Sequence, residues 1–202
     1  MRELTQDPFY ELINEQYSRC IIDYCLIAPD MPYRGIRSHR EAVLFAMLKM
    51  IERYIVDQRA SEERWAEEVK DNFFPWSFDI GKAEAHRIDP GELLFVPTVV
   101  RKIKGGSVIY DRADPDVDAG EQIPYWYAFL EPPQWSDYTP DDFRRVNGAL
   151  FPEGVDALEV FEWTTDWSNH FDAGHEWWGA ACWSVYDKHL DRFVVLFASA
   201  TD

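Results

Sequence analysis

The chain has 202 residues, of which 47% are hydrophobic and 16% aromatic, and its formal net charge at pH 7 is −17. This apolar content excludes a disordered chain, and the length favours one folded domain spanning residues 1–202. The acidic balance argues against nucleic acid and anionic membrane surfaces as partners, because both attract Lys and Arg.

A helix is predicted to begin at Pro8, because Asp7 can accept a hydrogen bond from a free backbone N–H and proline suits the first helical turn. Apolar residues then recur at steps of three and four. This spacing predicts that the helix continues to about Leu26 and stops before Pro29.

A second amphipathic helix is expected after a loop rich in proline. Ser38 and Glu41 have the spacing of a capping box at its start. A break near Ala60 or Ser61 is compatible with the more polar sequence there, and the helical part of the chain is expected to end at about residue 74.

From about residue 92 to 202 the pattern becomes rich in β-forming residues. Gly105 and Gly106 indicate a hairpin turn, residues 113–121 a loop, and residues 123–130 an aromatic strand. A short helix is predicted from Thr139 and Pro140 to about Leu150.

Three strands are expected after that helix. One covers residues 157–165, and residues 179–187 and 192–202 form an antiparallel hairpin whose last strand is apolar enough to be central. Helices followed by strands, without βαβ alternation, predict an α+β fold with N-terminal helices packed on a mainly antiparallel sheet.

Familiar catalytic and cofactor motifs are absent from the sequence. It has neither a phosphate-binding glycine loop nor a serine nucleophile elbow, and we predict no cofactor. Cys20, Cys25 and Cys182 are an odd number without metal-ligand spacing, so we interpret them as buried free thiols. The lack of a secretory signal and of a long apolar run predicts a cytoplasmic protein.

Residue types that can bind a partner or a metal are most concentrated between Glu162 and Asp187, where five tryptophans and two histidines lie among acidic residues. Trp163 and Trp183 fall in predicted strands and are expected in the core. The intervening residues 166–178 are expected to form a loop. Its candidate partner-binding residues are Asp166, Trp167, Asp172, Glu176 and Trp177.

A metal site is the alternative interpretation of the same loop. The side chains of His170, His175 and Glu176 can bind zinc or iron if the loop brings them together. Their spacing is not the helical pairing of a zinc-protease motif, and His86 or His189 could supply a third ligand.

Three stretches in about the last 75 residues carry a resemblance to a known group of proteins: YAFLEPP, EWTTDWSNHFDAGHEWWG and RFVVLFASATD. They resemble small, acidic, Trp-rich bacterial immunity proteins, which protect against secreted toxins. The resemblance implies a cytoplasmic protein without catalysis that binds and blocks a partner, often a basic nuclease.

The leading hypothesis is therefore a non-enzymatic, acidic protein-binding module, with a basic protein as its partner. The acidic charge agrees with this, since residues 113–202 hold 18 Asp or Glu against 4 Arg or Lys. One alternative is a small metal-dependent or acid/base hydrolase that uses His170, His175 and Glu176. Another is a structural protein whose aromatic strands form a dimer, and the sequence leaves the oligomeric state open.

Overall fold

A computed structural model describes residues 1–65, 76–96, 123–133, 136–176 and 178–200. Its centre is a six-stranded antiparallel sheet with the strand order β1-β2-β6-β5-β4-β3. The strands are β1 (Arg2–Glu3), β2 (Ile22–Ala28), β3 (Ala85–Ile88), β4 (Leu158–Trp163), β5 (Ala180–Asp187) and β6 (Arg192–Ser199). The helices are α1 (Pro8–Gln16), α2 (Ile36–Trp65), α3 (Pro90–Leu93), α4 (Tyr125–Leu130), α5 (Pro140–Leu150) and α6 (Asp172–His175), with a 3₁₀ turn η1 at Asn169–Phe171.

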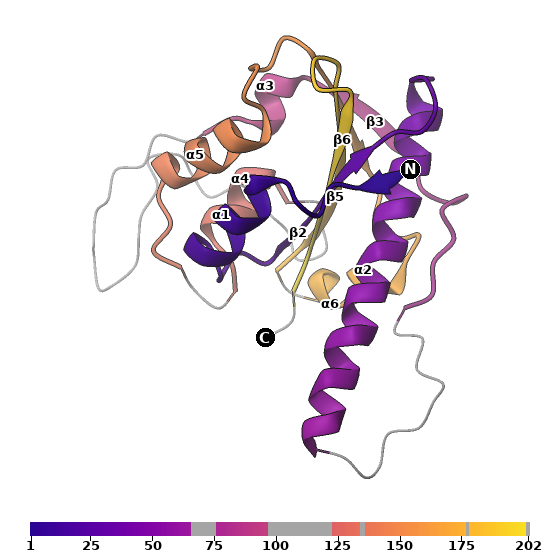
Figure 1. Ribbon diagram of the computed structural model, residues 1–202, viewed down its shortest axis with the longest axis vertical. Helices are drawn as coiled ribbons and strands as arrows, with labels where there is room; N and C mark the ends of the chain where they lie inside the picture. The colour runs from indigo at the N-terminus through magenta and orange to yellow at the C-terminus, as the bar shows by residue number, and fades with distance from the viewer. Residues whose placement is uncertain (66–75, 97–122, 134–135, 177, 201–202) are drawn as a thin grey trace.

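The helices cover both faces of this sheet (Figure 1). The long α2 packs on one face, over a core that includes Met47, Trp163 and Phe197. The shorter α1, α4 and α5 cover the other face, where Phe129 and Trp183 are buried. The predicted α+β class is therefore confirmed, and the C-terminal hairpin of β5 and β6 lies in the middle of the sheet as expected.

Alternation along β4 places its side chains on the two faces as the sequence predicts. Val160 lies in the core below α1, α4 and α5, and Trp163 lies in the core below α2 with 0% of its surface exposed. Trp183 on β5 is 1% exposed. The expectation that Trp163 and Trp183 fill the core is confirmed.

Two helix starts follow the predicted chemistry. The Asp7 carboxylate accepts a hydrogen bond from the Phe9 N–H at 3.0 Å, at the start of α1. At the start of α5, Thr139 and Asp142 form a capping box, in which each side chain accepts a hydrogen bond from the other residue's backbone N–H.

The prediction of one helix from Pro8 to about Leu26 is wrong in its second half. Helix α1 ends at Gln16, and the chain returns as β2, which pairs with β6 along Ile22 to Ile27. Consecutive buried residues from Tyr24 to Ile27 alternate between the two cores, as the residues of a strand do when both faces of its sheet are covered. Cys25 therefore lies in a strand.

Helix α2 differs from its prediction at the start and in the middle. It begins at Ile36, and Ser38 accepts a hydrogen bond from the Arg34 N–H at 2.9 Å instead of forming a capping box. Gly35, with φ of +63°, turns the chain into the helix. Helix α2 continues without a break to Trp65.

Two further helices lie at or beyond about residue 92, where the β-rich part of the chain was expected to begin, and the second replaces the aromatic strand expected over residues 123–130. Residues 90–93 form α3 because Asp89 caps Gly91 and Pro90 occupies the first turn, the same signal as at Asp7 and Pro8. Residues 125–130 form α4, which packs against α5. The predicted hairpin at Gly105 and Gly106 and the loop at residues 113–121 lie outside the described residues.

Within the part of the chain that the structure describes, no helix combines the length and the apolar character needed to cross a membrane.

Candidate functional site

Residues 166–178, here called the acidic segment, lie between β4 and β5. The described part of the segment, which leaves out residue 177, contains two short helical turns, η1 and α6. Hydrogen bonds tie the segment to the chain before β3. The Asp79 N–H donates to the Trp167 carbonyl at 2.8 Å, and the Ser77 N–H donates to the Asn169 side-chain oxygen at 2.8 Å. The backbone of the segment is therefore fixed by residues far away in sequence.

Aromatic side chains anchor the acidic segment from inside. Trp167 is 2% exposed and packs against Phe171 and Phe197, with ring centroids 5.4 and 6.4 Å away. Trp178 is 5% exposed, and its indole N–H donates to the Glu131 carbonyl at 2.9 Å. Trp167 was predicted to contact a partner, but its ring holds the segment in the core instead. Trp177 lies outside the described residues.

The three acidic candidates for partner binding lie at the surface, in contrast to the buried tryptophans. Asp166, Asp172 and Glu176 are all exposed. None of them forms an ion pair with another described residue. The segment thus has a buried aromatic side and a solvent-facing acidic side.

The alternative metal ligands do not form a ligand set. The His170 ring packs edge-on against Trp76 and Phe171, with centroids 4.8 and 4.9 Å away, and burial lowers its pKa to about 4. The His175 Nε2 lies 2.9 Å from the Thr165 hydroxyl. Among the described residues, Glu176 included, no group of three or more His, Cys, Asp or Glu is arranged to hold a metal ion.

Gly174 makes the close turn of the acidic segment possible. The Gly179 N–H donates to the Gly174 carbonyl at 2.6 Å, and the Gly174 N–H donates to the Ser199 hydroxyl at 3.2 Å. A β-carbon at position 174 would overlap the backbone carbonyl of Gly179. Because that carbonyl belongs to the backbone, it cannot rotate away.

We expect Gly174→Ala to lower the free energy of unfolding by about 2–3 kcal/mol, the cost of forcing atoms into a filled space. Gly148→Ala is the matched control, since a β-carbon there meets nothing within 4 Å. Alanine inside helix α5 should leave stability unchanged or raise it by about 0.5–1 kcal/mol. Urea unfolding of the two variants measures both effects, and equal stabilities would refute the packing argument.

A second group of polar and ionisable residues, which the sequence did not single out, lies where α2 packs on the sheet. His39 and Ser184 are both 0% exposed. The His39 Nδ1 is 2.8 Å from the Ser184 hydroxyl, and its Nε2 is 3.0 Å from the Tyr33 hydroxyl. Tyr33 donates to Glu159 at 2.7 Å, and the Trp163 indole donates to Ser184 at 2.8 Å.

The ionised Glu159 carboxylate determines which atom donates in each of the Tyr33, His39 and Ser184 hydrogen bonds. Burial disfavours the Glu159 carboxylate, but the hydrogen bond from Tyr33 and the charges of Arg87 and Lys188 outweigh it and lower the Glu159 pKa. An ionised carboxylate only accepts, so Tyr33 donates to it and accepts from the His39 Nε2–H. The His39 Nδ1 is then an acceptor for the Ser184 hydroxyl.

This chain of hydrogen bonds superficially resembles a serine nucleophile beside its base. Burial lowers the pKa of His39 to about 4, so the ring stays neutral, as a base requires. However, both Ser184 and His39 are fully covered, and no substrate can reach the hydroxyl without unfolding of the local structure. The group therefore fixes α2 on the sheet and does not form an active site.

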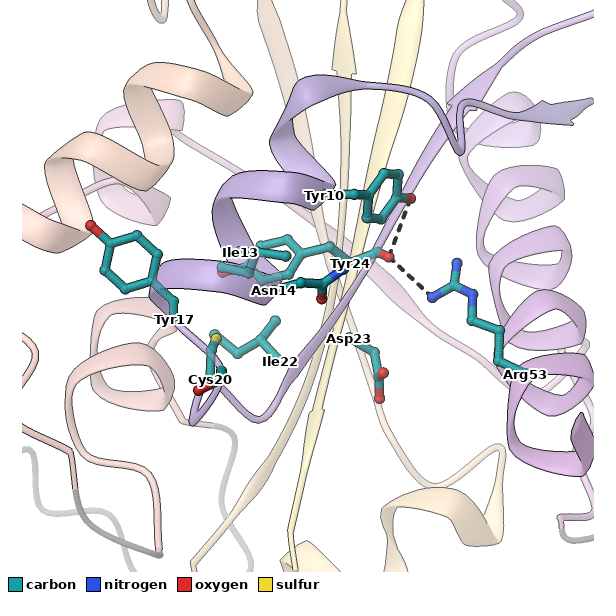
Figure 2. Close-up of a pocket in the computed structure, with 10 residues that line it drawn as sticks. Tyr10, Ile13, Asn14, Tyr17, Cys20, Ile22, Asp23, Tyr24 and Arg53 are labelled. Atoms are coloured by element: carbon teal, nitrogen blue, oxygen red, sulfur yellow. Dashed lines mark hydrogen bonds between the residues drawn. The ribbon is translucent and has the colours of Figure 1, made fainter. Parts of the chain in front are cut away.

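A pocket of about 270 Å³ opens between α1, β2 and α2 (Figure 2). Its lining residues are Tyr10, Ile13, Asn14, Tyr17, Ser18, Cys20, Ile22, Asp23, Tyr24 and Arg53. The Tyr10 hydroxyl and the Arg53 guanidinium both approach the Tyr24 carbonyl, each at 3.5 Å. Burial raises the pKa of Cys20 to about 12, so its thiol is not a nucleophile at neutral pH.

Comparison with known proteins gives no relative. No protein-family model matches the chain, and no curated protein or solved structure is similar enough to count as a match.

Proposed function

We propose that the chain is a non-enzymatic, acidic protein-binding module that captures a basic protein, in the manner of an immunity protein and its toxin. The observation that carries this proposal is the two-sided acidic segment. Trp167 and Trp178 fix it in the core, while Asp166, Asp172 and Glu176 remain exposed.

Charge supports the same conclusion. The net charge of −17 creates a negative field around the whole molecule, which speeds encounter with a cationic surface. Asp166, Asp172 and Glu176, which have no ion-pair partner among the described residues, can pair with Lys and Arg of a partner without first breaking such an ion pair.

Rigidity supports the segment as the contact surface. A loop that orders only on binding loses conformational entropy, and this loss weakens the complex. The hydrogen bonds of Ser77 and Asp79 to the segment, and the close packing at Gly174, already fix its backbone. Its acidic side is therefore preorganised.

The test is affinity capture from the source organism with three immobilised proteins. The first is the wild type, and the second carries Asp166→Asn, Asp172→Asn and Glu176→Gln. The third carries Asp141→Asn, Glu153→Gln and Asp156→Asn, which change the charge equally at exposed positions elsewhere. We expect the wild type and the third protein to retain one basic protein that the second loses. Retention of no basic protein by the wild type would refute the proposed function.

A further inference from the structure

The pocket between α1, β2 and α2 has an unbalanced charge. Arg53 forms an ion pair with Glu3, and its guanidinium also approaches the Tyr24 carbonyl. Asp23 has no ion-pair partner among the described residues, and Figure 2 shows its carboxylate apart from the Arg53 guanidinium. Because Glu3 already offsets the charge of Arg53, the pocket keeps one net negative charge from Asp23.

The remaining lining groups suit a cation with an aliphatic stem. The exposed side chains of Asn14 and Ser18 add oxygen acceptors, and neither forms a hydrogen bond with a described residue. Ile13, Ile22 and the tyrosines supply apolar wall, and aromatic rings attract cations. The volume of about 270 Å³ is below the roughly 300–1,000 Å³ of pockets for drug-sized ligands, so the ligand is the size of a side chain.

We propose that this pocket binds one organic cation, a primary ammonium or guanidinium on an aliphatic stem, with Asp23 as its counter-ion. A Lys or Arg side chain of a protein has this chemistry, and so has a free diamine. Only one part of this proposal rests on the proposed function, namely that the cation belongs to a basic protein partner.

The pH dependence of binding follows from Asp23. The Asp23 side chain as a whole is exposed, but the protein packed around its carboxyl partly desolvates that group and raises its pKa to about 6, and Arg53 opposes the rise. The other titratable lining groups have raised pKa values and keep their protons below pH 8: Tyr10, Tyr17, Cys20, Tyr24 and Arg53. Because a cation binds the ionised carboxylate, its affinity should fall about tenfold between pH 8 and pH 5.

The experiment is a titration of the full chain, followed by NMR, with four small probes. These are the N-acetyl N-methylamides of lysine, arginine and norleucine, and putrescine. We expect the cationic probes to cause saturable shifts in the amide signals of residues 14–24, and the uncharged norleucine probe to cause none. Equal binding of the norleucine probe would overturn the proposal.

Variants separate the charge from the shape of the pocket. Asp23→Asn should weaken binding of the lysine and arginine probes at least tenfold, while the control Asp57→Asn, an exposed acid on α2, should leave it unchanged. Asn14→Asp adds a second carboxylate and should tighten binding about threefold, a gain that loss of structure cannot imitate. Unchanged affinity in both pocket variants would contradict the assignment of Asp23.

One comparison, between putrescine and the amide probes, identifies the source of the cation. A tenfold tighter affinity for putrescine than for the amide probes would assign it to a free diamine, and equal or weaker affinity would assign it to a protein side chain. Because these probes are small molecules, their result does not depend on whether a basic protein is captured, so failure of the proposed function and failure of the pocket are distinguishable.

Discussion

Replacing Arg192 with methionine is expected to lower the free energy of unfolding by about 3 kcal/mol, the lower end of the cost of removing one partner from a buried ion pair, because Asp7 is only partly buried. Arg192 is 7% exposed and lies at the start of β6. Its guanidinium donates to the Asp7 carboxylate at 2.6 Å and to the Leu150 carbonyl at 2.5 Å. One side chain thus joins β6 to the start of α1 and the end of α5.

The large effect comes from the groups that Arg192 would leave behind. Asp7 would keep its bond to the Phe9 N–H but lose its counter-ion, and the Leu150 carbonyl would lose its donor. Arg144→Met is the matched control, because Arg144 pairs with Asp141 on the exposed side of α5. Its cost should stay below about 1 kcal/mol. Urea unfolding compares the two, and a similar small cost for both would refute the role of Arg192.

The second large effect is a pH-dependent cost of replacing His39. The folded protein holds His39 neutral with a pKa of about 4, against 6.5 for a free histidine. As pH falls below 6.5 the unfolded chain binds a proton that the folded protein does not, so the stability supplied by neutral His39 is lost. In His39→Gln this loss is absent.

The cost of His39→Gln should therefore be larger at neutral pH than in acid. From the two pKa values, it should shrink by about 2.5 kcal/mol between about pH 7.5 and pH 4.5. Groups common to both proteins, such as His170 and Asp23, cancel in this difference. His189→Gln is the control, since it makes the same substitution at an exposed histidine. A cost of His39→Gln that does not change with pH would contradict the buried neutral imidazole.

Local signals in the sequence identified the elements whose structure is decided locally. Thr139, Pro140 and Asp142 predict α5 because capping concerns only neighbouring residues. The alternation in residues 157–165 predicts β4 for the same reason. The start of α1 at Pro8 was also predictable from Asp7.

The wrong predictions share a different cause, since tertiary contacts decide them. The apolar spacing that predicts a helix continues to about Leu26, but pairing of β2 with β6 buries both sides of that part of the chain and selects a strand. Residues 125–130 are aromatic enough for a strand, yet they lie as α4 against α5. The sequence contains no signal for either partner.

The candidate site was predictable to a similar extent. The exposure of Asp166, Asp172 and Glu176 was predictable, because charged side chains are seldom buried without a partner. The burial of Trp167 was not predictable, since tryptophan is common both in cores and in interfaces. The hydrogen bonds of His39 join residues up to 145 positions apart, so no local sequence pattern predicts them.

The most direct test of the proposed function is the affinity of the captured basic protein for the acidic segment, measured at about 50 and 500 mM salt, where screening differs strongly. Substitution of Asp166, Asp172 and Glu176 by their amides should weaken binding at least tenfold at low salt, mainly through slower association, and much less at high salt. The control substitutions at Asp141, Glu153 and Asp156 should change it less than threefold. Equal affinities of the two substituted proteins would contradict the acidic segment as the binding surface.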